Sequence, residues 1–142
     1  WMRSHPRCMA IAIEKSNSRL KMIEQNANNL GVPMLKIVPG TLSQVVDNLP
    51  LPDAIFVGGG LSNSNQHGSN SLLEICWRLL KPGGRLVAHA VTFETEQKLL
   101  SWHKINGGDL TRLSISRADS IGKFNGWKPL RPVTQYSVTK EC

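Results

Sequence analysis

The chain has 142 residues, of which 40% are hydrophobic and 19% charged, a composition typical of a folded globular domain. Its 17 Lys and Arg residues exceed its 10 Asp and Glu residues, which gives a formal net charge of +7. The length predicts a single domain over residues 1–142. The composition argues against global disorder. Polar residues interrupt every apolar run well before the roughly 18 residues of a membrane span, so no membrane association is expected.

Short apolar runs alternate with helical patterns along most of the chain. The first run, residues 9–13, ends on Glu14, and a helix is predicted over 17–30 because Leu20, Ile23 and Ala27 recur on one face. The same alternation predicts a strand over 35–38, a short helix over 42–49, a buried strand over 53–57, a helix over 71–80, a strand over 85–91 and a helix over 93–105.

The pattern changes after residue 109. Two β-rich runs, 110–117 and 133–139, follow each other without a helix between them, and a loop with several glycines is predicted to connect them. Strand–helix alternation over the earlier part predicts an α/β fold with a mostly parallel, Rossmann-like sheet. The last two strands add an antiparallel ribbon at its edge. In such a sheet, ligands bind at the carboxyl ends of the strands.

Glu14 stands where an acid can accept hydrogen bonds from both hydroxyls of a ribose. In nucleotide-binding sheets this acid lies about 20 residues after the first glycine of the phosphate loop. Counting back from Glu14 passes residue 1, so the first strand and the glycine loop are expected to lie upstream of this chain, and the 142 residues by themselves are expected to be impaired in donor binding and activity. The alternative is a surface acid that is favoured at a helix start by the helix dipole.

Three consecutive glycines, Gly58, Gly59 and Gly60, follow the strand predicted over 53–57. They allow a ligand to approach the backbone closely, or they form a flexible connector. Asn63 stands where the third glycine of a dinucleotide fingerprint would be, so that motif is not predicted.

The cysteines and histidines favour neither a disulfide framework nor a metal site. Cys8, Cys76 and Cys142 lack C-x-x-C spacing, which indicates idle thiols in a reducing compartment such as the cytoplasm. The four histidines show no spacing typical of metal ligands, and no bound metal is predicted.

The basic residues are scattered, with no run of four and no basic helical stripe, although residues 112–131 are the densest stretch. A nucleic-acid partner is therefore not favoured. A polyanionic small molecule such as a polycarboxylate fits this stretch, and a solvated basic surface remains the alternative.

Several motifs together resemble class I S-adenosylmethionine-dependent methyltransferases. They are Ala12-Ile13-Glu14, Pro39-Gly40, Asp53 through Gly60, and Leu80-Lys-Pro-Gly-Gly through Ala88. The stretch Val87-Ala-His-Ala-Val-Thr92 and the tail from Gly122 to Gln135 narrow this resemblance. They are similar to the decarboxylating precorrin-6Y methyltransferase family of cobalamin biosynthesis, specifically to its C-terminal, C15-methylating domain.

The resemblance implies S-adenosylmethionine as cofactor and a precorrin, a tetrapyrrole rich in carboxylates, as substrate. It also implies methylation at C15 and loss of carbon dioxide from the ring-C acetate. The methyl donor is expected over Glu14, Gly40, Thr41, Gly58, Gly59 and Gly60. Family members are often tetrameric, so a homo-oligomer is expected, and a second methyltransferase domain upstream is a further expectation.

Two residues depart from the family pattern. Thr41 stands where many relatives carry an acid, and His89 stands where relatives commonly carry Asn. His89 is the candidate catalytic residue, with a hydrogen-bonded core histidine as the alternative. Four basic residues are the candidates for binding the peripheral carboxylates of the substrate: Arg112, Arg117, Lys123 and Arg131.

Two other functions remain open from the residues alone. One is another class I methyltransferase that acts on RNA or on a different small molecule, because a basic surface fits that function too. The other is a non-catalytic oligomerisation or binding module with a degenerate methyltransferase fold. The tail from Gly122 to Gln135 favours the precorrin reaction over both.

Overall fold

The computed structural model describes residues 1–61 and 71–141. The chain divides into two compact units, Trp1–Pro50 and Leu51–Cys142, which are described separately below. The predicted polar stretch with Asn63, as well as Cys142, lies outside the described residues. That residues 1–142 form one domain, and that a first strand and glycine loop lie upstream, both stay predictions.

The first unit contains two parallel strands that are connected by a helix. Its elements are β1 (Ile11–Glu14), α1 (Asn17–Asn29), β2 (Lys36–Pro39), α2 (Leu42–Val45) and the 3-10 helix η1 (Val46–Asn48). Ile11 pairs with Lys36 and Glu14 with Pro39, so the carboxyl ends of both strands lie side by side. A single short helix was predicted over 42–49, and the structure has two shorter helical segments there, α2 and η1.

The second unit is built on a four-stranded sheet with the strand order β3-β4-β8-β5. Its strands are β3 (Ala54–Val57), β4 (Arg85–Ala90), β5 (Asp109–Leu113) and β8 (Val133–Thr139), and its helices are α3 (Leu72–Leu79) and α4 (Phe93–Asn106). β3 and β4 are parallel, whereas β8 pairs antiparallel with both β4 and β5. The predicted parallel pairing and the antiparallel C-terminal ribbon are both confirmed.

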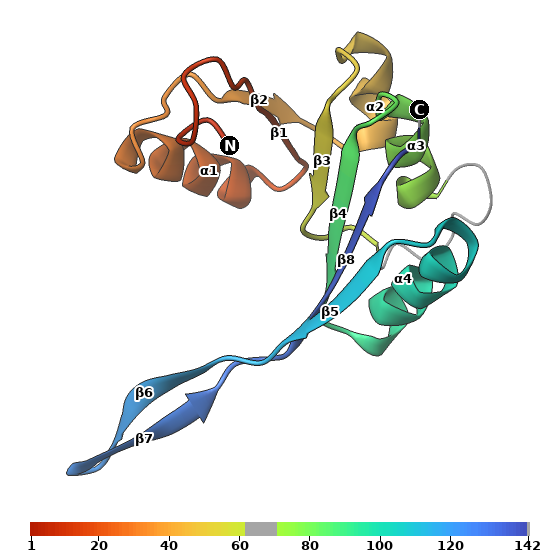
Figure 1. Ribbon diagram of the computed structural model, residues 1–142. Coiled ribbons are helices and arrows are strands. Elements are labelled where there is room, and N and C mark those ends of the chain that lie inside the picture. The colour runs from red at the N-terminus through yellow and green to blue at the C-terminus, as the bar shows by residue number, and fades with distance from the viewer. Residues whose placement is uncertain (62–70, 142) are drawn as a thin grey trace. The chain divides into compact units, whose positions relative to one another are not determined.

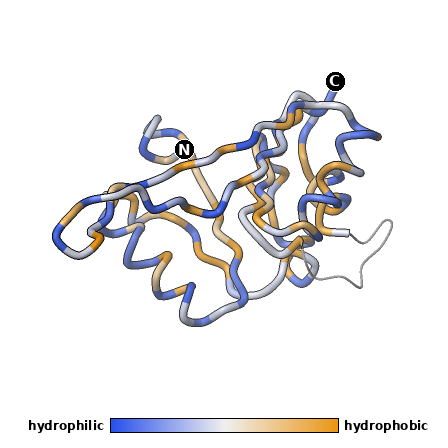
Figure 2. Tube along the Cα trace, turned by 90° about the horizontal axis from the view of Figure 1, so that it is seen from below, coloured by the Kyte–Doolittle hydropathy of each residue, from blue (hydrophilic) through white to orange (hydrophobic). Residues whose placement is uncertain are grey.

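Helices α3 and α4 lie on the same side of this sheet (Figure 1). Alternate residues of β4 and β8 are buried, and Leu86, Ala88 and Tyr136 have no exposed surface. Cys76 of α3 and Leu99 of α4 are buried to the same degree. Hydrophobic segments, drawn in orange, recur along the trace near the C-terminus, which belongs to this unit (Figure 2). The core of the second unit therefore lies between one face of the sheet and the two helices.

A lysine ties the end of α3 to the end of the sheet. Lys140 Nζ donates hydrogen bonds to the carbonyl oxygens of Trp77 and Leu80, at 2.8 and 2.7 Å. These carbonyls belong to the last turn of α3, where the helix leaves acceptors without partners. A cation at this end also interacts favourably with the helix dipole. Lys140 thus stabilises the helix end that leads into β4.

The connection between β5 and β8 differs from the prediction. It contains a β-hairpin, β6 (Ser116–Ile121) and β7 (Phe124–Pro129), where a loop was predicted. The strand predicted over 110–117 is accordingly divided between β5 and β6. Gly122 and Lys123 form the turn, and Gly122 has φ +60°, which a two-residue hairpin turn with glycine in its first position requires. The hairpin extends away from the four-stranded sheet (Figure 1).

No helix within residues 1–61 and 71–141 combines the length and the apolar character that crossing a membrane requires.

Candidate functional site

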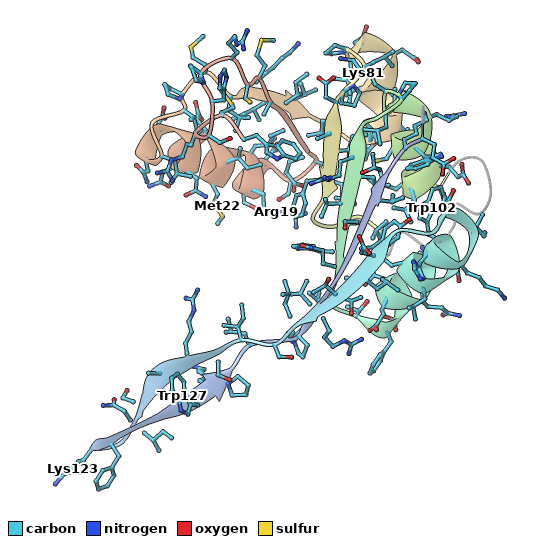
Figure 3. The ribbon with its side chains drawn as sticks, in the orientation of Figure 1. Arg19, Met22, Lys81, Trp102, Lys123 and Trp127 are labelled. Carbon is cyan, nitrogen blue, oxygen red and sulfur yellow. The ribbon has the colours of Figure 1, made fainter. Side chains whose placement is uncertain are left out.

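The Glu14 side chain lies at the carboxyl end of β1 and is held there by three hydrogen-bond donors. Its Oε1 atom accepts hydrogen bonds from the backbone N–H groups of Lys15 and Ser16, at 2.8 and 2.9 Å. Its Oε2 atom lies 3.0 Å from Nε of Arg19 in the first turn of α1. Only 19% of the Glu14 side chain is exposed, against 60% of the Arg19 side chain. The carboxylate is thus ordered by the loop that leads into α1 (Figure 3, which labels Arg19).

These contacts lower the pKa of Glu14 below its ordinary value. The hydrogen bond from the Ser16 N–H group has the largest effect, and the charge of Arg19 and the Lys15 N–H group add to it. Partial burial opposes them by favouring the neutral acid. The group is therefore a carboxylate at neutral pH. With two of its donors on Oε1 and one on Oε2, an acceptor position remains on Oε2.

Gly40 and Thr41 lie beside Glu14, because they directly follow the neighbouring parallel strand. The Gly40 N–H group donates a hydrogen bond of 3.0 Å to the backbone oxygen of Glu14. Thr41 is the residue before α2, and both its N–H group and its hydroxyl contact Oε1 of Gln44, each at 2.9 Å. The first unit thus brings together three of the residues predicted for donor binding.

The three glycines predicted to contact the donor directly follow β3 in the second unit. A Cβ atom at Gly59 would meet nothing within 4 Å, so the backbone there is open to an approaching group. After the glycines the chain turns inward, since Leu61 is only 4% exposed. Lys98 of α4 donates a hydrogen bond of 2.6 Å to the Leu61 backbone oxygen. The glycine segment is thus anchored to α4 at its far end.

His89 lies one residue before the carboxyl end of β4, on the sheet face opposite to α3 and α4. Its Nε2 atom is 3.0 Å from Oε1 of Gln135, the residue that faces it on β8. The Phe56 ring meets the His89 ring edge-on, with 4.9 Å between the ring centres. The imidazole is half-buried and held from two sides. The hydrogen bond to Gln135 is what the alternative for His89, a hydrogen-bonded core histidine, predicts. The position of His89 near the carboxyl end of β4 also allows a contact with substrate.

The four basic residues predicted to bind substrate are not gathered into one cluster. Arg112, in β5, forms an ion pair with Glu96 of α4. Arg117 lies in β6 opposite Lys128, and Lys123 lies in the hairpin turn, at the tip in Figure 3. Arg131 is exposed in the segment between β7 and β8. These charges are therefore distributed along the ribbon, and the Arg112 side chain is already paired with a carboxylate.

Three side chains that sequence reasoning did not single out contact the predicted site residues or, for Lys98, the residue that follows the glycines. They are Arg19 beside Glu14, Gln135 beside His89, and Lys98 beside the glycine segment. Arg19 follows Glu14 by five residues across a strand–helix junction, a spacing that matches neither the helical nor the strand period. Gln135 and Lys98 are distant in sequence from their partners. Only the three-dimensional structure reveals these contacts.

The buried Cys76 thiol is unreactive, and the described residues contain no arrangement of metal-binding side chains. Burial raises the pKa of the Cys76 thiol to about 12, so this group is neither a thiolate nor a nucleophile at neutral pH. No group of three or more His, Cys, Asp or Glu side chains within residues 1–61 and 71–141 is arranged to hold a metal ion.

The similarity of this chain to known proteins extends over almost its whole length. Residues 1–140 match a family model described as a precorrin methyltransferase domain. The chain is 46% identical over 140 residues to the decarboxylating precorrin-6Y C(5,15)-methyltransferase of a Sinorhizobium species, which is 99% of this chain and 32% of that protein. It thus spans about a third of the length of that relative.

Two further similarities involve shorter proteins. The chain is 27% identical over 142 residues to the decarboxylating cobalt-precorrin-6B C(15)-methyltransferase of Salmonella typhi, covering 96% of this chain and 69% of that protein. A crystal structure of a domain of a precorrin-6Y C5,15-methyltransferase from Corynebacterium diphtheriae superimposes with a TM-score of 0.83. That match has 39% identity and covers 99% of this chain and 79% of the crystallised one.

Proposed function

Because this chain belongs to the family of precorrin methyltransferase domains, we propose that it methylates a precorrin at C15 and removes carbon dioxide from its ring-C acetate. Its fold is that of the class I methyltransferases. The Salmonella typhi relative supports the assignment to C15, since most of that C(15)-specific enzyme is covered by this chain. The proposed pathway is cobalamin biosynthesis.

We propose S-adenosylmethionine as the methyl donor, and the Glu14 carboxylate is the observation that carries this proposal. Glu14 is ionised, ordered at the end of β1, and has an acceptor position left on Oε2. A ribose hydroxyl is a donor suited to that position. Gly40 and Thr41 lie at the adjacent strand end of the same unit. Gly58, Gly59 and Gly60 of the second unit are retained as further candidate donor ligands, and the backbone at Gly59 is open. The residues present therefore fit the donor.

S-adenosylmethionine, when bound, supplies an electrophilic methyl group on a sulfonium. The protein's task in such a transfer is to bring the accepting carbon and the methyl group into line. Glu14, Gly40 and the glycine segment would bind and orient the donor. His89 is held by Gln135 and Phe56 at the carboxyl end of β4, where it would contact the substrate. Decarboxylation needs an electron sink, and the macrocycle of the substrate itself provides one.

The basic residues of the ribbon are proposed to bind the peripheral carboxylates of the precorrin. Arg117 and Lys123 are exposed on the hairpin, and Arg131 is exposed in the segment that follows it. Arg112 would have to exchange Glu96 for a substrate carboxylate, and that ion pair is only partly covered from solvent. A long-range role in attracting the polyanionic substrate fits all four residues.

A homo-oligomer that forms through the β6–β7 hairpin is also proposed, and a tetramer is the expected form. Every residue of the hairpin except Gly126 is exposed, including Ile121, Phe124 and Trp127. Two-stranded hairpins are marginally stable in water unless another surface covers them. A second copy of the chain would provide that cover. The cytoplasm is the proposed location, because the buried Cys76 thiol is suited to a reducing compartment.

The test of donor binding is calorimetry with S-adenosylhomocysteine, the neutral product form of the donor. Glu14→Gln removes the charge and the second acceptor oxygen, and it is expected to weaken binding by at least about tenfold, since a hydrogen bond to a charged group contributes roughly 1.5–3 kcal/mol. Glu24→Gln is the matched control, because Glu24 is an exposed acid on α1. It is expected to bind like the unaltered chain.

Two results would contradict the proposed donor site. Glu14→Gln could bind S-adenosylhomocysteine as tightly as the unaltered chain does, which would exclude a direct role of this carboxylate. The chain could also fail to bind S-adenosylhomocysteine even when it is extended by the expected upstream strand and glycine loop, a result expected for a non-catalytic module with a degenerate methyltransferase fold.

A further inference from the structure

Arg19 occupies a position that helix stability does not explain. It lies in the first turn of α1, which starts at Asn17, and that turn contains no acidic residue. The N-terminal end of a helix carries a partial positive charge, so a cation is disfavoured there. Side chains that stabilise this end are normally acidic or act as caps. The Ser16 side chain makes no capping hydrogen bond to this helix either.

The side chain of Arg19 is turned back to the end of the preceding strand. Its Nε atom lies 3.0 Å from Oε2 of Glu14, whereas Lys15 and Ser16 donate to Oε1. The backbone donors alone would leave the carboxylate free to tilt about Oε1. Arg19 adds the third point of attachment, on the other oxygen, and this contact sets the direction of Oε2.

The two carboxylate oxygens therefore differ in what they can still accept. Oε1 already has two donors, which is its full number of lone pairs, whereas Oε2 has one donor and one open lone pair. A ribose hydroxyl would bind at this open position. The geometry points to Arg19 as a positioning residue that orients Oε2 of Glu14 toward a hydroxyl of the methyl donor. This inference rests on the proposed function, but its first test does not require the donor.

The first test follows the Glu14 carboxyl carbon by NMR as the pH is lowered. In the unaltered chain the pKa of Glu14 is below its ordinary value, and Arg19 is one of the causes. Arg19→Met keeps the length of the side chain but removes the charge and the N–H donors. The Glu14 resonance should then titrate at higher pH than in the unaltered chain. Arg19→Lys, which keeps the charge, should restore part of the difference.

Lys21→Met is the control for a general change of charge, because Lys21 is an exposed cation on the same helix. It should leave the Glu14 titration where it is in the unaltered chain. The inference is overturned if Arg19→Met leaves the Glu14 resonance unchanged, or if Lys21→Met shifts it equally. Either result would mean that no specific contact joins Arg19 and Glu14 in solution.

The second test measures the affinity for S-adenosylhomocysteine by calorimetry. Arg19→Met should weaken binding by about two- to fivefold at neutral pH, the scale of an exposed ion pair. The loss should grow as the pH falls, because Glu14 becomes protonated earlier in this variant. A merely structural role of Arg19 would not couple affinity to pH in this way.

Equal or tighter binding by Arg19→Met would overturn the inference, since Arg19 would then be idle or would compete with the ribose for Oε2. Failure of the unaltered chain to bind S-adenosylhomocysteine is a different result. It refutes the proposed function if the chain extended by the expected upstream strand and glycine loop also fails to bind, and in either case the Glu14 titration decides whether Arg19 orients and stabilises this carboxylate.

Discussion

At the end of β1, one carboxylate accepts hydrogen bonds from the loop and the helix that follow it. Glu14 is a candidate donor ligand because two backbone N–H groups and Arg19 fix its orientation. Glu24, on the same helix as Arg19, is an exposed acid. The surroundings of Glu14, and not only its place near a strand end, are what make it a candidate binding group.

Glu14 was predictable from the sequence, whereas its partner was not. An acid that ends an apolar run just before a helix has a recognisable position in a Rossmann-like sheet. Arg19 has no such position, because its contact depends on the path of the loop at Lys15 and Ser16. His89 and Gln135 show the same limit, since their pairing is set by the register of two strands that are far apart in sequence.

Gly108 provides a stability prediction for a single residue. Its φ is +87°, and a Cβ atom there would lie 2.5 Å from the Ser137 backbone oxygen and 2.9 Å from Cβ of Val138. Gly108→Ala should lower the free energy of unfolding by about 2–4 kcal/mol, measured by urea denaturation. Alanine disfavours the positive φ of this position, and its Cβ atom would overlap with atoms of β8.

Gly59→Ala is the control for this substitution. A Cβ atom at Gly59 would meet nothing within 4 Å, and its φ lies outside the left-handed region. The free energy of unfolding should change by less than about 0.5 kcal/mol. Similar losses for the two variants would contradict the close packing of Gly108 against β8.

At the scale of elements, the strands that sequence reasoning located correctly are those with one buried face. β8 alternates between buried and partly exposed residues, and its bounds match the prediction, 133–139. The β6 strand has six exposed residues, so no alternation of apolar and polar side chains marks it in the sequence. This is why residues 118–129 were predicted as part of a loop, although the turn glycine, Gly122, was among the residues noted there.

The exposed hairpin leads to a prediction about association. Phe124 is 80% exposed and Trp127 77% exposed, and both lie on β7 (Figure 3 labels Trp127). If a second copy covers the hairpin, the double variant Phe124→Ala and Trp127→Ala should shift the mass in analytical ultracentrifugation from oligomer toward monomer. The loss of two buried aromatic side chains at an interface accounts for that shift.

Met22→Ala is the control for this experiment, since Met22 is 59% exposed but lies on α1. It should leave the mass unchanged, and circular dichroism should show that both variants remain folded. A chain that is monomeric before substitution, or an oligomer that persists in the double variant, would contradict association through the hairpin.

At the scale of the whole molecule, the predicted site residues fall into both compact units. Glu14, Gly40 and Thr41 belong to residues 1–50, whereas the glycine segment and His89 belong to residues 51–142. Sequence reasoning found both groups for the same physical reason: each follows or ends a parallel strand, and the carboxyl ends of such strands bind ligands. The four basic residues were proposed from their charge and from the carboxylate-rich substrate that the resemblance implies. Neither predicts spacing or partners, as the Arg112–Glu96 ion pair shows.

The most direct test of the central claim is mass spectrometry of the reaction product. The chain, extended by the upstream strand and glycine loop that its sequence leads us to expect, is incubated with S-adenosylmethionine and a precorrin that carries the ring-C acetate, in metal-free and cobalt-containing forms. We predict a product that has gained one CH2 and lost one CO2, with S-adenosylhomocysteine released in equal amount. A precorrin recovered unchanged in both forms, while the chain transfers the methyl group to RNA or binds the donor without turnover, would contradict the proposed function.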